Sequence, residues 1–272
     1  MYKRQAQGDY RGCRNHGLGD SYGFISAARA PGLWGGYAEY QYLAPDSVLH
    51  PVPEGVDPAL ATIFNPLGAG IRWGVGVPGT SEGEVVAVLG PGIRGLSVVA
   101  AVKEAGAGFV MVTGRGPNDA PRLDMAKRFG ADLVVDVAEA DPVAELRKAT
   151  GGQADVVVDV TAKAPAAFAQ AIDLARHSGR VVVAGTRGVA ETPGFAPDLL
   201  VFKEVHVMGA LGVDGASYRA ALDLIATRKY PFEELPRGTA DLDGAEELLS
   251  TMAGEGGPPP IHGVLIPGGT DA

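Results

Sequence analysis

The sequence has almost no cysteine and no excess of positive charge. Its one cysteine, Cys13, can form no disulfide within the chain and cannot by itself supply the four ligands that zinc prefers. The formal net charge is −9 and no long run of Lys or Arg occurs, so the clustered cations that bind nucleic-acid phosphates are missing. These shortages exclude a disulfide scaffold and argue against a nucleic-acid partner.

Long apolar runs are missing as well. No stretch of about 18 uninterrupted apolar residues occurs, and the first residues lack the apolar segment of a secretory signal. We therefore expect a cytoplasmic protein with no membrane partner. The apolar fraction of 46% over 272 residues is that of a globular protein with a substantial core.

From residue 85 onward, short apolar runs alternate with helical patterns. The runs are Val85 to Leu89, Phe109 to Thr113, Leu133 to Asp136, Asp155 to Asp159, Arg180 to Ala184 and His206 to Gly209. The helical patterns begin near Ile93, Pro121, Pro142, Pro165 and Asp198. Near-continuous apolar strands separated by helices are typical of a parallel sheet covered on both faces. The pattern predicts an α/β fold with one doubly wound sheet of six strands.

The flanking segments have weaker patterns. Residues 35–43 alternate like a β-strand, and Asp57 is placed to cap a helix that runs to Trp73 and bends at Asn65-Pro66. The other expected elements are a helix over 217–227, a helix over 241–253 and a strand over 262–266, with Asp198 and Asp241 as further helix caps.

A glycine motif joins the first predicted strand to its helix. Leu89 is followed by Gly90-Pro91-Gly92-Ile93-Arg94-Gly95, which has the Gly-x-Gly-x-x-Gly spacing. Gly90 would make the tight turn, Gly92 would let a pyrophosphate approach the backbone, and Gly95 would let the helix pack on the strand. The first helical amides, including those of Ile93 and Arg94, would face the phosphates. The motif predicts a dinucleotide site, with a purely structural turn as the alternative.

The end of the second strand should select the ribose. An acidic residue there binds the 2′-hydroxyl of NAD, but this strand ends in Thr113-Gly114-Arg115. A guanidinium without a neighbouring carboxylate suits a 2′-phosphate, which favours NADP over NAD. In the alternative, Arg115 is solvated and Asp119 or Asp124 takes the acidic role.

Two later strand ends should lie at the same edge of the sheet. Thr161 follows the fourth strand, and Gly185 and Thr186 follow the fifth. Ligands of open α/β sheets bind at the carboxyl ends of the strands, so these residues are candidate contacts of the ribose or nicotinamide. They could instead only cap the helices that follow.

Several segments in the chain resemble the medium-chain dehydrogenase/reductase superfamily, in its zinc-type alcohol, sorbitol and threonine dehydrogenase branch. They are Gly36 to Tyr40, Asn65 to Leu67, Gly90 to Gly95, Ala126 to Asp132, Asp155 to Asp159, Gly179 to Val182 and Ile261 to Pro267. The resemblance implies a Rossmann sheet inserted in a GroES-like β domain. The implied domains are residues 6–75 (partial catalytic domain), 76–228 (Rossmann domain) and 229–272 (return to the catalytic domain).

The resemblance also implies hydride transfer between a nicotinamide and a small alcohol, polyol or ketone, in a homo-oligomer such as a dimer or tetramer. Zinc usually polarises the substrate oxygen in this family. Here Asn65 occupies the place of a ligand or supporting acidic group, and an amide is a poor zinc ligand; it could orient a water or the substrate, or only cap the break at Pro66.

The beginning of the chain departs from the family pattern. Gly8 to Cys13 looks like the end of a structural-zinc loop, but Gln5 stands where the third cysteine belongs. We therefore expect an N-terminally truncated chain in which Cys13 is an orphan ligand, with zinc left to a longer parent. The alternative is a natural member of the family that has lost both metals. The remaining functional alternatives are a zinc-free quinone or enoyl reductase and a catalytically inactive dinucleotide-binding protein.

Overall fold

The computed structural model of the chain describes residues 22, 24–45, 47–188 and 191–269. Contacts divide it into two compact units. The sheet unit comprises Asn65–Leu211 and Arg228–Pro231, and the terminal unit comprises the described residues up to Phe64, Gly212–Thr227 and those from Phe232 onward. The domain boundaries expected from the sequence stay a prediction. No helix in the described part of the chain is both long and apolar enough to cross a membrane.

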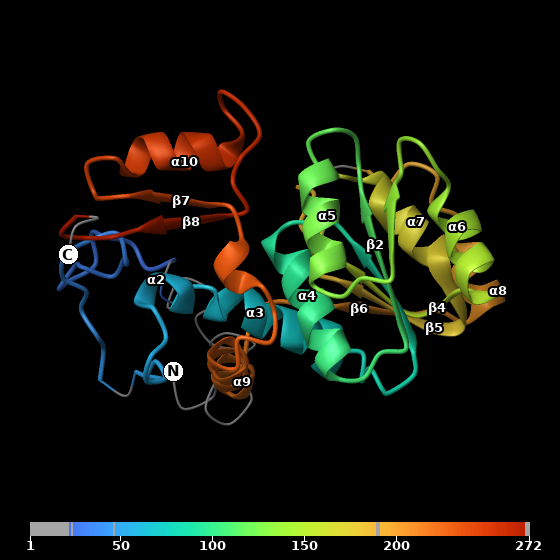
Figure 1. Cartoon of the computed structure of the whole chain (residues 1–272), viewed down its shortest axis with the longest axis horizontal. Coiled ribbons are helices and arrows are strands. Elements are labelled where there is room, and N and C mark those ends of the chain that lie inside the picture. The colour runs from blue at the N-terminus through green and yellow to red at the C-terminus, as the bar shows by residue number, and fades with distance from the viewer. Residues whose placement is uncertain (1–21, 23, 46, 189–190, 270–272) are drawn as a thin grey trace. The chain divides into compact units, whose positions relative to one another are not determined.

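The sheet unit is built on six parallel strands in the order β3–β2–β1–β4–β5–β6 (Figure 1). This order confirms the doubly wound sheet predicted from the sequence. The strands are β1 (Val85–Leu89), β2 (Phe109–Gly114), β3 (Leu133–Asp136), β4 (Ala154–Asp159), β5 (Ala175–Val183) and β6 (His206–Gly209).

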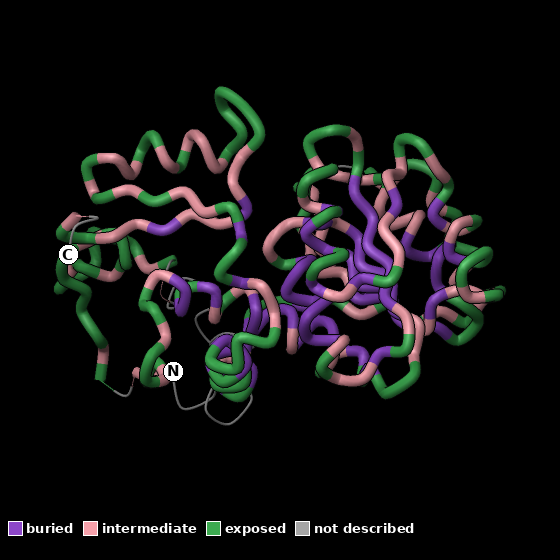
Figure 2. Tube along the Cα trace, viewed as in Figure 1, coloured by how far each residue is buried: buried purple, intermediate pink, exposed green. Residues whose placement is uncertain are grey.

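Helices cover both faces of this sheet (Figure 1). On one face α4 (Ile93–Glu104) packs on β1 and β2, beside α5 (Ala120–Arg128). On the other face α6 (Pro142–Thr150) and α7 (Ala166–Leu174) pack together, and α8 (Asp198–Lys203) contacts β5. The inner strands are therefore buried on both sides (Figure 2), which is why their sequences are nearly continuous runs of Val.

A broken helix precedes strand β1 in the chain. The chain forms α2 (Pro58–Ala61), α3 (Phe64–Ile71) and a π-helical turn η2 (Arg72–Gly76). The predicted break at Asn65-Pro66 falls slightly earlier, between α2 and α3. Pro66 is the third residue of α3, where its missing N–H leaves no helical hydrogen bond unmade.

The terminal unit has a small parallel pair of strands, β7 (Arg237–Ala240) and β8 (His262–Leu265). Helix α10 (Ala245–Ala253) packs on both strands, and α2 contacts α9 (Gly215–Ala226). A 3-10 turn, η3 (Phe232–Glu234), precedes β7. The side chain of Thr62 lies 2.8 Å from His262 Nε2, which ties the end of α2 to β8.

Three local predictions were wrong, and β7 was not predicted. Residues 35–43 form no strand, because an alternating segment needs a neighbouring strand to satisfy its backbone. Asp198 is the first residue of α8 and not its cap, which is Pro197. Asp241 accepts a hydrogen bond from Gly244 N–H at 2.8 Å, so it caps the turn before α10 and not the helix itself. Asp57 caps α2 as predicted, since it accepts hydrogen bonds from two amides of that helix.

Candidate dinucleotide site

The carboxyl ends of three strands meet at one edge of the sheet. In the strand register Leu89 of β1 lies beside Thr113 of β2 and beside Asp159 of β4. The strand order reverses between β1 and β4, so the connections from these strands leave toward opposite faces of the sheet. This carboxyl edge is the place where doubly wound sheets bind ligands.

The glycine turn lies at this edge and fits a pyrophosphate. Gly90 has a φ of +102° and donates its N–H to Thr113 O at 3.1 Å, which fixes the tight turn. A Cβ on Gly95 would lie 1.9 Å from Gly90 O, so only glycine allows α4 to pack this closely. A Cβ on Gly92 would meet no atom within 4 Å, and no side chain caps the first amides of α4. A phosphate could approach those amides directly.

The predicted ribose position packs against the glycine turn. A Cβ on Gly114 would lie 3.0 Å from Pro91 Cγ and 3.0 Å from Asp119 Cβ, so the end of β2 touches the turn. Arg115 is exposed, and its N–H donates to Asp119 Oδ2 at 2.9 Å. The other oxygen of that carboxylate pairs with Arg122 Nη1 at 3.3 Å. Asp124 lies further along α5, where it pairs with Lys127.

A second carboxylate binds the loop after β2, which carries Arg115. Asp136, the last residue of β3, accepts hydrogen bonds from Gly116 N–H and Ala138 N–H, both at 2.9 Å. These two bonds, with the charge of Arg115, hold the pKa of the Asp136 carboxyl below its ordinary value. The loop that carries Arg115 is therefore fixed through its backbone, while the guanidinium stays available to a ligand.

A buried polar cluster lies at the ends of β4 and β5. Asp159 is fully buried, and its Oδ1 accepts hydrogen bonds from Thr161 N–H at 3.0 Å and from Thr161 Oγ1 at 2.7 Å. Its Oδ2 forms an ion pair with Arg187 Nη2. Burial raises the pKa of Asp159, and the contacts from Thr161 and Arg187 act against that rise.

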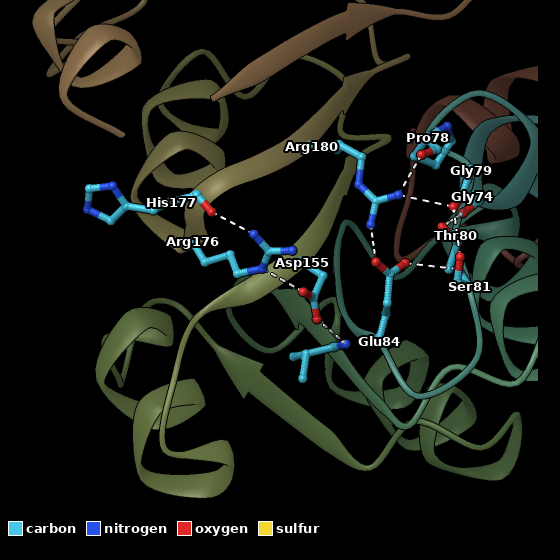
Figure 3. A network of polar contacts seen from close by, with 11 residues as sticks. Gly74, Pro78, Gly79, Thr80, Ser81, Glu84, Asp155, Arg176, His177 and Arg180 are labelled. Carbon is cyan, nitrogen blue, oxygen red and sulfur yellow. Dashed lines mark hydrogen bonds and ion pairs between the residues drawn. The ribbon is translucent and has the colours of Figure 1, made fainter. Parts of the chain in front are cut away.

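The amino edge of the sheet has its own network of arginines and carboxylates (Figure 3). Arg180 Nη1 donates to Pro78 O at 2.7 Å and to Gly79 O at 3.0 Å, and its Nη2 pairs with Glu84. Arg176 Nε pairs with Asp155 at 2.6 Å. These contacts tie β4 and β5 to the segment before β1, at the end of the sheet opposite the glycine turn.

The sequence also offered Asn65 as a catalytic candidate and Cys13 as a metal ligand. Asn65 is exposed in the first turn of α3, and Cys13 falls outside the described residues. Across the described ranges, no three His, Cys, Asp or Glu side chains come together to form a metal site. The glycine turn therefore fits a dinucleotide, whereas the described residues give zinc no ligand set.

Sequence reasoning did not select Asp159, Arg187, Arg122 or Asp136 as site residues. A signal for the first was available, because a carboxylate that ends an otherwise apolar buried strand needs a nearby cation. Arg187 follows the neighbouring strand and could have been proposed as that cation. The positions of Asp136 and Arg122 depend on how the loop after β2 folds, which the local sequence does not specify.

Comparison with known proteins gives a family match over part of the chain. Residues 95–227 match the family described as zinc-binding dehydrogenase. A Mycobacterium tuberculosis H37Rv protein named "Probable alcohol dehydrogenase adh" is 68% identical over 262 residues, which cover 96% of this chain and 71% of that protein. The L-threonine 3-dehydrogenase of Saccharopolyspora erythraea is 36% identical over 155 residues, or 56% of this chain and 42% of that enzyme.

Solved structures share the same architecture. A zinc-binding dehydrogenase from Sinorhizobium meliloti 1021, solved with NADP bound, is 29% identical and matches with a TM-score of 0.68 over 79% of this chain and 61% of that one. An alcohol dehydrogenase from Thermotoga maritima gives a TM-score of 0.80 over 98% of this chain and 72% of that one. At 24% identity the latter likeness concerns the fold alone.

Proposed function

This chain belongs to the zinc-binding dehydrogenase family of NAD(P)-dependent alcohol oxidoreductases, and from that premise we propose that it binds NADP through the glycine turn at Gly90–Gly95. The observation that carries the proposal is the open, uncapped approach to the first amides of α4 at Gly92. Backbone N–H groups and the helix dipole at this point would hold the pyrophosphate. The nicotinamide, when bound, supplies the hydride chemistry.

We propose that Arg115 selects NADP over NAD. Its side chain is exposed next to Gly114, and the Asp119 carboxylate already accepts hydrogen bonds from Arg115 N–H and Arg122. A 2′-phosphate would gain charge-assisted hydrogen bonds from the guanidinium. The NADP complex of the Sinorhizobium meliloti relative supports this choice.

The substrate proposal is a small alcohol, polyol or ketone. The names of the relatives support this class. We propose that Asn65, in the first turn of α3, orients the substrate oxygen or a water. Because the described residues offer zinc no ligand set, we derive no step through a metal.

We further propose that the chain forms a homo-oligomer through strand β6. This strand is the last in the sheet order, and apolar side chains on it and on the preceding helix α8 are exposed: Val201, Phe202 and Val207. An open edge with exposed apolar residues is a template for pairing with a second copy. Light scattering should give the wild-type protein a mass above that of one chain. The variant Phe202→Lys should have the mass of a monomer. A monomeric wild type would contradict the proposal.

The test of the function is a titration with NADPH and NADH, followed by tryptophan fluorescence. Trp73 is a natural reporter, because it is buried and Arg94 of the glycine turn lies 5.8 Å from its ring centroid. A Trp34→Phe background leaves Trp73 as the only indole in the chain. We expect NADPH to bind at least about tenfold more tightly than NADH, a difference of about 1.4 kcal/mol.

Arg115→Gln should remove most of that preference by weakening NADPH and leaving NADH unchanged. Lys127→Gln is the matched control, because it removes one exposed positive charge from α5 that pairs with Asp124 in the same helix. Tighter binding of NADH than of NADPH by the wild type would mean that Arg115 does not select NADP. Binding of neither nucleotide would overturn the proposed function.

A further inference from the structure

Arg187 holds two loops at the carboxyl edge of the sheet. On the loop after β4 its Nε donates to Ala164 O at 3.1 Å, and its Nη2 reaches Thr161 Oγ1 at 3.4 Å and pairs with Asp159. On the loop after β5 its Nη1 donates to Gly185 O at 3.3 Å. One guanidinium therefore connects the segments that follow both strands.

The two loops are also in direct backbone contact. A Cβ on Gly185 would lie 1.8 Å from Thr161 O, and Lys163 N–H donates to Thr186 O at 3.4 Å. Thr161, Gly185 and Thr186 are the residues that we predicted to meet the ribose or nicotinamide. Arg187 itself contacts Thr161 Oγ1 and Gly185 O, so its position helps to set the distance between the two loops.

The pair is deeply buried. The Arg187 side chain is 10% exposed and that of Asp159 is 0% exposed. Removing two charges from water costs free energy that their attraction often does not recover, so a buried ion pair is weak evidence for a purely stabilising role. Rigid geometry of the groups around a ligand is what such a pair can provide.

We propose that Arg187 and Asp159 act as a positioning pair that fixes the two loops for the nicotinamide half of the cofactor. This inference rests on the proposed dinucleotide function and names the residues that position one half of that site. Neither side chain needs to touch the cofactor. The glycine turn and Arg115 would hold the adenosine half independently of the pair.

The test compares a whole cofactor with its adenosine half, using all 272 residues of the chain. Arg187→Lys keeps the charge but cannot reach acceptors on both loops in the same geometry. We expect Arg187→Lys to raise the Kd of NADPH by roughly tenfold. The Kd of 2′,5′-ADP, and of 5′-ADP measured alongside it, should change by less than about twofold.

Arg180→Lys is the matched control. Arg180 lies on β5 itself, also donates to two carbonyls and one carboxylate, and holds the amino edge of the same sheet (Figure 3). This variant should lose stability while binding NADPH and 2′,5′-ADP as the wild type does. A role in stability alone would make the two lysine variants behave alike.

Each other outcome decides the question. Equal weakening of NADPH and 2′,5′-ADP by Arg187→Lys, or no weakening of either, overturns the positioning role while leaving the proposed function intact. If Arg187→Lys does not fold, the double variant Asp159→Asn/Arg187→Gln removes both charges and is measured in its place. Failure of both variants to fold, with Arg180→Lys folded, would make the pair purely structural. A wild type that binds neither nucleotide rejects this inference together with the proposed function.

Discussion

Strands β4 and β5 have an arginine–carboxylate pair near each end, and the two ends treat these charges differently. At the amino edge the side chains of Arg176 and Asp155 are 44% and 21% exposed, and Arg180 pairs with Glu84 while still partly exposed. At the carboxyl edge Asp159 is completely buried against Arg187. The same strands therefore have a partly solvent-exposed ionic network at one end and a buried ion pair at the other.

The carboxyl groups of β4 follow this difference in their pKa values. Burial raises the pKa of Asp159. Burial alone would also raise the pKa of Asp155, but hydrogen bonds from Val85 N–H and Arg176, with the charges of Arg176 and Arg180, lower it overall. The amino edge therefore uses charge to join secondary-structure elements. The carboxyl edge accepts the cost of burying charge at the place where the ligand loops meet.

The largest expected effect comes from adding one methyl group to a glycine at each edge. A Cβ on Gly95 would lie 1.9 Å from Gly90 O at the carboxyl edge, and a Cβ on Gly108 would lie 2.6 Å from Gly83 O at the amino edge. Gly95→Ala and Gly108→Ala should each lower the free energy of unfolding by roughly 1–3 kcal/mol, measured by urea denaturation. Only Gly95→Ala should also abolish NADPH binding under conditions where the variant is folded.

Gly92→Ala separates binding from stability. Its φ is −72° and the added Cβ would meet no atom within 4 Å, so the free energy of unfolding should change by less than about 0.5 kcal/mol. NADPH affinity should still fall by at least about tenfold, because the methyl group occupies the approach of the pyrophosphate. Normal binding by Gly92→Ala, or equal loss by Gly108→Ala and Gly95→Ala, would show that the edges do not differ in function.

A smaller effect is expected when the amino-edge network loses its carboxylate. Glu84 pairs with Arg180 and accepts the Ser81 N–H at 2.9 Å (Figure 3). Glu84→Ala should lower the free energy of unfolding by about 1–2 kcal/mol and leave the Kd of NADPH unchanged. Glu104→Ala, which removes a more exposed pair with Lys229, should cost less than about 1 kcal/mol. A change in the Kd of NADPH caused by Glu84→Ala would break the distinction between the edges.

Much of the sheet unit could be predicted because its signals are local. The inner strands β1, β2 and β4 are mostly apolar runs, whereas β5 starts at Ala175, five residues before the expected Arg180, because its first half is polar. The glycine spacing at Gly90, Gly92 and Gly95 specifies a turn whatever the rest of the chain does. The expected strand over residues 35–43 failed for the opposite reason. A strand of that kind depends on a partner segment, and alternation along one segment cannot report whether a partner is present.

The candidate site divides in the same way. The residues on the glycine turn and at the strand ends were selected as candidates from their positions in the sequence, and their roles stay predictions. The Asp159–Arg187 pair was not selected, because residues 28 positions apart become neighbours only through the parallel register of β4 and β5. Polar contacts across a sheet edge depend on loop conformation and rotamers, which single-sequence patterns do not encode.

The smallest expected effect is a difference in pH dependence that belongs to the amino edge. The pKa of Asp155 in the folded protein is below its ordinary value of 3.8, so the folded state binds fewer protons than the unfolded state as the carboxyl titrates. Its contribution to stability is therefore present above about pH 3.8 and is lost as the pH falls through the folded pKa.

Because solvent screens this partly exposed group, Asp155→Asn should cost less than about 1 kcal/mol near neutral pH. The difference in the free energy of unfolding between Asp155→Asn and the wild type should disappear in acid, measured by urea unfolding across the pH range. Asp124→Asn, which removes a carboxylate that is 73% exposed, is the control for the loss of a surface charge. A gap for Asp155→Asn that stayed constant with pH would mean that its hydrogen bonds, and not its charge, hold the amino edge together.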